Sequence, residues 1–271
     1  MRLVSFNVNS IRVRLHQLQA VIDKHSPEII GIQETKVTDE EFPIEEINEL
    51  GYQVQFHGQK THYGVALLSR EKPVKVVKGF SHDDENSQRR LIRCDFSLPD
   101  DRLMTVINGY FPQGENRSHS IKFPGKQKFY ADLHDLIVSE HKPEDLLIVM
   151  GDVNVAPLDN DIGIGENNMK RWLKEGKACF LPEEREWLQK LVDWGMVDTY
   201  RARYPDVDDL FSWFDYRSRG FEREPKRGLR IDLILASTAA SVFCTDAGID
   251  YDIRAMDRPS DHCPIWSELA L

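Results

Sequence analysis

The chain has 271 residues, of which 41% are hydrophobic and 30% charged, a balance typical of globular proteins that excludes a disordered or fibrous chain. The longest apolar run, Leu146–Met150, is too short to cross a bilayer, and Asn7 and Asn9 interrupt any N-terminal signal core, so neither a membrane anchor nor a secretory peptide is predicted. The net charge of −10 alone argues against nucleic-acid binding, although a bound cation or a local basic surface reverses that argument.

Short apolar runs bounded by turn residues predict strands along the whole chain. They lie at Leu3–Phe6, Ile29–Ile32, Tyr63–Leu68, Leu91–Phe96, Met104–Ile107, Leu146–Met150 and Ile231–Leu235. Helical periodicity predicts helices at His16–Lys24, Lys126–Ser139, Glu166–Lys174 and Glu183–Trp194. The loose alternation of these elements indicates an α/β fold with mixed or antiparallel sheets. No linker or repeat divides the chain, so we expect one domain over residues 1–271.

The four cysteines are far apart in the sequence and form no CxxC pair. Disulfide scaffolds and zinc sites are therefore not predicted, and reduced thiols indicate a cytoplasmic protein.

Two segments echo each other, Leu3–Asn9 (LVSFNVN) and Leu147–Asn154 (LIVMGDVN). Each is an apolar strand that ends in amide or carboxylate side chains. Two such strands predict two half-sheets that face one another, with a functional site at their shared edge.

Polar clusters follow several predicted strands, where α/β enzymes usually carry function. They are Asn7–Asn9, Gln33–Thr35, Gly151–Asn154 and Ser260–His262, with Arg230–Asp232 at the start of a further strand. Asp and Asn are also common turn formers, so the conjunction of the clusters carries the prediction, not any one of them.

The clusters hold oxygen ligands, a histidine and no cysteine, which favours Mg²⁺, Mn²⁺ or Ca²⁺ over zinc. Glu34 is the first choice for a direct ligand, with Asn7 beside it. A hydrogen bond from His262 to Asp232 would orient the ring and raise its pKa. The chain contains neither a P-loop nor a GxSxG motif, and Gly163–Gly165 lacks the rest of a dinucleotide loop.

Six motifs follow one another in order: Ser5–Arg12 (SFNVNSIR), Ile30–Lys36 (IGIQETK), Val106–Gly114 (VINGYFPQG), Gly151–Pro157 (GDVNVAP), Gly228–Ser237 (GLRIDLILAS) and Ser260–Ile265 (SDHCPI). In these motifs and their spacing, the chain resembles the bacterial exonuclease III/AP endonuclease family of the endonuclease/exonuclease/phosphatase superfamily over essentially its whole length. The resemblance implies a four-layer α/β sandwich, in which two mixed β-sheets pack face to face with helices outside. It also implies a single active site at one sheet edge.

The same resemblance implies a role for each polar side chain. Glu34 would bind the metal, Mg²⁺ with Mn²⁺ as a possible substitute, while Asn7 contacts metal or phosphate and Asp261 lies near the metal. Asn9 stands where some relatives carry a carboxylate ligand, which leaves the number of metal ligands open.

For the reaction itself, the resemblance implies that Asp152 orients and deprotonates the attacking water and that Asn154 hydrogen-bonds the same phosphate or nucleophile. His262, paired with Asp232, would donate to a phosphate oxygen, and Tyr110 would face the phosphate or leaving group. In an alternative scheme His262 is the general base.

A basic stretch, Arg217–Arg230, follows a cluster of aromatic residues, a combination that suits a nucleic-acid backbone and an everted nucleotide. The resemblance places Trp213 in the pocket for a baseless sugar, with Leu229 near it. We also expect substrate contacts from Gln113, Arg90 and Arg217. Lys126 is an expected surface charge that could contact a phosphate.

Together these features predict a DNA repair nuclease. It would cleave 5′ to abasic sites and act as a 3′→5′ exonuclease and 3′-phosphatase/phosphodiesterase on duplex DNA, as a monomer that needs neither a membrane nor a protein partner. One alternative is a phosphoesterase of the same superfamily acting on a small-molecule or lipid phosphate. Another is a binding module that keeps the fold without catalysis.

Overall fold

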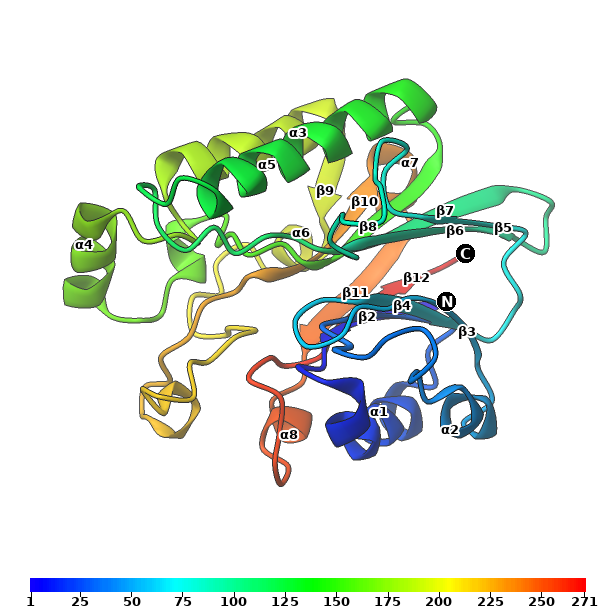
Figure 1. The fold of residues 1–271 in the computed structure, drawn as a ribbon, viewed down its shortest axis with the longest axis horizontal. Helices are drawn as coiled ribbons and strands as arrows, with labels where there is room; N and C mark the ends of the chain where they lie inside the picture. The colour runs from blue at the N-terminus through cyan, green and yellow to red at the C-terminus, as the bar shows by residue number, and fades with distance from the viewer.

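Two six-stranded sheets pack face to face in the computed structural model, which describes residues 1–271 (Figure 1). Helices cover the outer face of each sheet, so the predicted four-layer α/β sandwich is confirmed. The first sheet is covered by α1 (Ile11–His25), α2 (Ile44–Glu49) and α8 (Tyr251–Arg254). The second is covered by α3 (Lys122–Glu140) and α5 (Pro182–Trp194).

The two sheets have the same internal topology. In spatial order the first contains β11 (Cys244–Ile249), β12 (Ile265–Leu269), β1 (Arg2–Asn7), β2 (Ile29–Gln33), β4 (Val65–Ser69) and β3 (Gln53–His57). The second contains β9 (Met196–Asp198), β10 (Asp232–Ser237), β8 (Leu146–Asp152), β7 (Leu103–Tyr110), β6 (Leu91–Ser97) and β5 (Lys75–Lys78). In each sheet only the third and fourth strands in this order are parallel, so β1 and β8 occupy equivalent positions.

The central strands are mainly apolar because both of their faces are buried. In β8, Ile148 and Met150 pack between the sheets, whereas Leu147 and Val149 pack under α3 and α5. Successive side chains of a strand point to opposite faces, so one continuous apolar run supplies two layers of core.

The remaining short elements lie around the rim of the sandwich. They are η1 (Asp159–Asp161), α4 (Glu166–Glu175), α6 (Thr199–Arg203), η2 (Gly220–Glu222) and α7 (Thr238–Ser241). None of the helices is both long and apolar enough to pass through a membrane.

A buried polar bridge joins the two sheets. Asn108 of β7 donates to the carbonyl oxygens of Ile32 (2.9 Å) and Ala66 (2.8 Å) in the first sheet. Gln33 of β2 donates to Asn108 Oδ1 (2.6 Å) and to Ser5 Oγ (3.0 Å). Because Gln33 directly precedes Glu34, this bridge lies immediately below the candidate site.

Candidate active site

The ends of β1 and β8 meet at one edge of the sandwich, as their sequence echo predicted. Asn7 Nδ2, at the end of β1, donates to Asp152 Oδ2, at the end of β8, over 3.0 Å. The same nitrogen donates to Glu34 Oε1 over 2.9 Å. Asn7 therefore links two carboxylates that arise from different sheets.

Glu34 follows β2 in a left-handed backbone conformation, with φ of 53°. Lys36 Nζ lies 2.8 Å from Glu34 Oε2 and also donates to Asn9 Oδ1. The sequence predicts no role for Lys36, although this residue belongs to the motif that contains Glu34. Its ammonium group offsets the charge of the Glu34 carboxylate at Oε2, whereas Asn7 donates to Oε1.

Asp152 is buried at the centre of the site, with 2% of its surface exposed. The turn after it is held locally, since Asn154 N–H donates to Asp152 Oδ1 (3.0 Å) and Asn154 Nδ2 donates to the carbonyl oxygen of Phe111 (2.9 Å). Burial raises the pKa of Asp152, and the charge of His262 acts in the opposite direction. Asp152 is thus a carboxylate with an increased affinity for a proton.

His262 and Asp232 form the predicted pair, with Nδ1 of the ring 2.8 Å from Asp232 Oδ2. The other ring nitrogen, Nε2, faces Asp152 Oδ2 at 3.7 Å. Burial acts to lower the pKa of His262, but the Asp232 and Asp152 carboxylates outweigh it and raise that pKa. The ring is therefore an imidazolium in the neutral range.

Two serines without a predicted role fix this pair. Ser212 Oγ accepts the backbone N–H groups of Ile231 and Asp232, each over 3.0 Å. Ser260 Oγ donates to the carbonyl oxygen of Asn7 over 2.6 Å, which attaches the His262 turn to β1. Neither serine has a sequence pattern that predicts this role.

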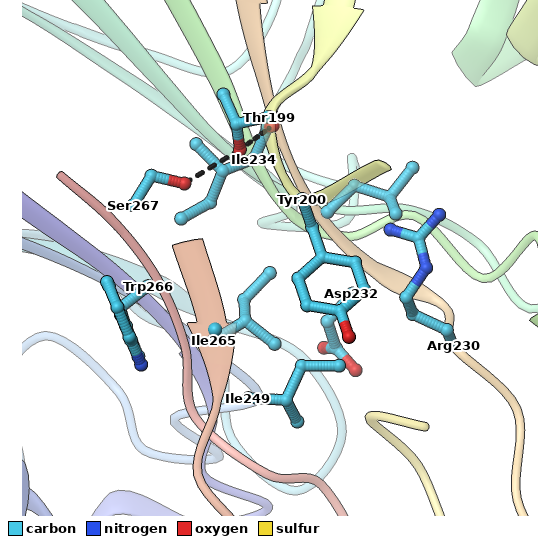
Figure 2. A pocket seen from close by; sticks show the side chains of 11 residues that line it. Thr199, Tyr200, Arg230, Asp232, Ile234, Ile249, Ile265, Trp266 and Ser267 are labelled. Atoms are coloured by element: carbon cyan, nitrogen blue, oxygen red, sulfur yellow. Dashed lines mark hydrogen bonds between the residues drawn. The ribbon is translucent and has the colours of Figure 1, made fainter. Parts of the chain in front are cut away.

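Behind Asp232 the sheets leave a cavity of about 10 Å³, roughly the room of one water molecule (Figure 2). Thr199 lines it, and its Oγ1 hydrogen-bonds with Ser267 Oγ (2.7 Å) and the carbonyl oxygen of Ile234 (2.8 Å).

Glu34, Asp152 and His262 each offer one ligand atom within 4.8 Å of the others, a cluster that could hold a metal ion. Its two carboxylates are the hard donors that divalent cations such as Mg²⁺ prefer, so the donor set fits. The oxygens of Asp261 accept from Asn9 Nδ2 (2.8 Å) and Trp213 Nε1 (3.0 Å), and Asn7 Oδ1 accepts from Asn9 N–H (3.0 Å). Asp261 and Asn7 thus border the cluster with their oxygens already engaged.

Tyr110 ends β7 and lies opposite Asp152 in the strand register. Burial and the charges of Glu34 and Asp152 hold the pKa of its phenol well above the ordinary value. The expected substrate contact Arg90 is buried instead: its guanidinium lies 4.8 Å from the Tyr110 ring centre and donates to the Tyr110 carbonyl oxygen (2.9 Å). The charge of Arg90 acts to lower this pKa but does not outweigh burial and the two carboxylates, so Tyr110 remains a hydrogen-bond donor.

The other expected substrate residues differ in how far they are exposed. Trp213 is half-buried, bridges to His262 and exchanges two backbone hydrogen bonds with Leu229 (2.9 and 3.0 Å), which is fully buried. Gln113 is exposed, with its amide nitrogen 3.6 Å from Cys179 Sγ. Arg217 is exposed.

Two basic residues expected on the DNA-facing surface are buried, so those expectations were wrong. Arg230 Nε and Nη2 lie 2.6 Å from Asp161 and 2.7 Å from Asp198, respectively. Lys126 Nζ lies 2.5 Å from Glu184 Oε1, and neither side chain is exposed. The sequence shows that a residue is charged, but it does not show which distant residue neutralises that charge in the folded chain.

Comparison with known proteins gives consistent results over the whole chain. Residues 4–262 match the endonuclease/exonuclease/phosphatase family. Exodeoxyribonuclease III of Haemophilus influenzae is 54% identical over 268 residues, 99% of each chain.

Two solved structures are similar over 100% of both chains. A 3′ phosphatase from Neisseria, bound to product DNA hairpin, has a TM-score of 0.89 at 34% identity. An AP endonuclease from Archaeoglobus fulgidus has a TM-score of 0.89 at 31% identity.

Proposed function

The chain belongs to the endonuclease/exonuclease/phosphatase family, and from this premise we propose that it is a DNA repair nuclease of the exodeoxyribonuclease III type. It hydrolyses the phosphodiester 5′ to an abasic site and leaves a 3′-hydroxyl. By the same chemistry it removes nucleotides and phosphates from 3′ ends of duplex DNA.

The observation that carries this proposal is the convergence of Glu34, Asp152 and the Asp232–His262 pair at one sheet edge. Phosphodiester hydrolysis requires a proton acceptor, a cationic hydrogen-bond donor and a cation site, all within hydrogen-bonding reach of one point. Their separate origins in the two sheets explain why no short motif contains them all.

In our assignment Asp152 accepts the proton of the attacking water, because its raised pKa makes it a better base than an exposed carboxylate. Asn154 lies beside it and orients the nucleophile. His262, kept cationic by Asp232, donates from Nε2 to a non-bridging phosphate oxygen and stabilises the charge that develops there. Tyr110 donates its phenol proton in a hydrogen bond to the phosphate.

Glu34 is the residue that we assign to the cation, with Mg²⁺ as the physiological ion and Mn²⁺ as a substitute. A cation bound there supplies Lewis-acid stabilisation of charge on the phosphate and the leaving oxygen. Asn7 keeps Glu34 and Asp152 apart at fixed positions, which lets one bind the ion while the other remains free for the water.

DNA reaches this edge across the rim that carries Trp213 and Arg217. We assign Trp213 to the pocket for a baseless sugar, with the fully buried Leu229 packed behind it, and Arg217 and Gln113 to contacts with the DNA. The protein acts as a monomeric single domain in the bacterial cytosol, where its substrate lies.

The deciding experiment uses end-labelled duplexes with and without an abasic site, each with Mg²⁺ or EDTA. Metal-dependent incision 5′ to the abasic site, together with slower shortening from the 3′ end, is the expected result. Cleavage that continues undiminished in EDTA would contradict the proposal, as would activity on inositol phosphates but not on abasic DNA.

A further inference from the structure

A fully buried ion pair lies behind the active site. Lys126, in the first turns of α3, and Glu184, in the first turn of α5, both have 0% side-chain exposure. Burial removes the hydration of each charged group, which costs free energy. Such a pair is therefore unfavourable unless further hydrogen bonds satisfy both groups.

The lysine completes its hydrogen bonds on the two loops that form the site. Its Nζ donates to the carbonyl oxygens of Asn154 (2.8 Å) and Gln113 (3.2 Å). Asn154 lies two residues after Asp152, and Gln113 lies three residues after Tyr110. One ammonium group therefore holds the segment that follows each of these residues.

The turn held in this way is one that the backbone does not favour by itself. Asn154 has φ of 53°, in the left-handed region that few non-glycine residues occupy. Such conformations persist where the surroundings determine them. Besides Lys126, the turn receives a hydrogen bond from Tyr130 Oη to the Val153 carbonyl oxygen (2.7 Å).

The glutamate extends the support to a third segment. Glu184 Oε2 accepts the backbone N–H groups of Cys179 and Leu181, each over 2.8 Å. Cys179 also has a positive φ, 104°, and its Sγ lies 3.6 Å from Gln113 Nε2. The pair thus connects three loops with unusual backbone geometry.

Stability alone is a weak explanation for this arrangement. Replacing a buried ion pair by apolar residues of similar volume is often neutral or stabilising, so the fold does not need the charges as such. What an apolar pair cannot do is hold carbonyl oxygens at a defined distance.

We propose that Lys126 and Glu184 are positioning residues for phosphodiester hydrolysis. By fixing the carbonyl oxygens of Asn154 and Gln113, the pair sets where Asp152 and Tyr110 lie relative to one another. This inference rests on the proposed function, since it takes Asp152 and Tyr110 as parts of the reacting centre.

The test compares two double variants of the full chain in the abasic-duplex assay with Mg²⁺. Lys126→Met/Glu184→Gln removes the buried charges but keeps an oxygen for the N–H donors of Cys179 and Leu181. The matched control, Arg93→Met/Glu140→Gln, removes an ion pair at the far end of the same helix α3. The wild-type rate in the same assay tests the proposed function separately.

We expect kcat of the site variant, measured at a temperature where it is fully folded, to fall about 100-fold with KM close to that of the wild type, because a small misplacement of reacting groups slows chemistry without weakening binding. Its melting temperature falls, since two buried carbonyl oxygens lose their donor. The control variant keeps the wild-type kcat. An unchanged kcat in the site variant would overturn the inference, as would a fall that only follows a loss of folded protein. If the double variant is poorly folded, both double variants and the wild type are assayed at a lower temperature at which circular dichroism shows all three to be folded, and a wild-type kcat there overturns it too.

Discussion

At the scale of single residues, the charges around His262 and Asp152 decide which proton each group can hold. The carboxylates of Asp232 and Asp152 outweigh burial and raise the pKa of His262, while burial raises the pKa of Asp152. The imidazole nitrogen and the Asp152 oxygen face each other over 3.7 Å. His262, a cationic hydrogen-bond donor, and Asp152, a proton acceptor, therefore lie side by side in the buried site.

Replacing Asp152 by asparagine tests the acceptor. Asp152→Asn keeps the shape of the side chain but cannot take a proton from water, so we expect kcat to fall by about 10³-fold or more. DNA affinity, measured by fluorescence anisotropy on an abasic duplex, should stay close to that of the wild type. A variant that still cuts at a near-normal rate would remove Asp152 from its assigned role.

Glu34→Ala tests the cation site. Loss of the carboxylate should shift the Mg²⁺ titration of cleavage to higher concentration and lower the maximal rate about 100-fold. Asp39→Ala, a change of a carboxylate outside the metal cluster, is the control and should leave the titration unchanged. Superimposable titrations of Glu34→Ala and wild type would exclude Glu34 from the site.

Asp232→Asn tests the role of His262 through pH. Removing the carboxylate charge lowers the pKa of the imidazole, because that charge is what raises it. If His262 acts as a cation, the cation is lost at lower pH and the alkaline limb of the kcat/KM profile shifts toward acid. A shift of the acidic limb instead would support the scheme in which His262 is the general base.

At the scale of elements, strand position decides what the sequence can predict. The seven strands predicted from apolar runs are β1, β2, β4, β6, β7, β8 and β10, all of them inside a sheet. The four edge strands, β3, β5, β9 and β11, were not predicted, because an edge strand is partly exposed and its residues do not form an apolar run. The interior strand β12 was missed because its burial alternates along the strand.

The ion pairs of Arg230 connect secondary-structure elements, whereas the Lys126–Glu184 pair connects loops. Arg230 lies two residues before the start of β10 and contacts Asp161 of η1 and Asp198 of β9. Arg230→Met leaves two carboxylates short of a partner, so we expect the free energy of unfolding to fall by about 3 kcal/mol or more in urea titrations. Arg217→Met, at an exposed position, should stay within about 0.5 kcal/mol of the wild type and instead weaken DNA binding. Equal stability of the two variants would contradict the distinction.

At the scale of the whole molecule, the site depends on how the two sheets are placed. Motif resemblance predicted that Glu34, Asp152 and His262 meet, and their ligand atoms do lie within 4.8 Å of one another. The orientation of Asn7 and the burial of Arg90 and Lys126 could not be predicted, because they follow from contacts between segments distant in sequence.

The polar bridge between the sheets gives a test at this scale. Asn108→Leu removes the donor to two carbonyl oxygens of the first sheet and a partner of Gln33. We expect about 2 kcal/mol or more of lost stability, since buried polar groups are left unsatisfied. Asn48→Leu, on the exposed side of α2, is the control and should change stability by less than about 0.5 kcal/mol. A stable Asn108→Leu variant would show that the bridge is dispensable.

The pairing of β1 with β12 has a consequence for biosynthesis. β1 leaves the ribosome early, but its antiparallel neighbour β12, and His262 just before it, are translated only after every other strand of both sheets. A nascent chain halted before residue 260 would possess Glu34 and Asp152 but not the imidazole that faces them. The imidazole therefore joins the two carboxylates only when β12 is placed between β1 and β11.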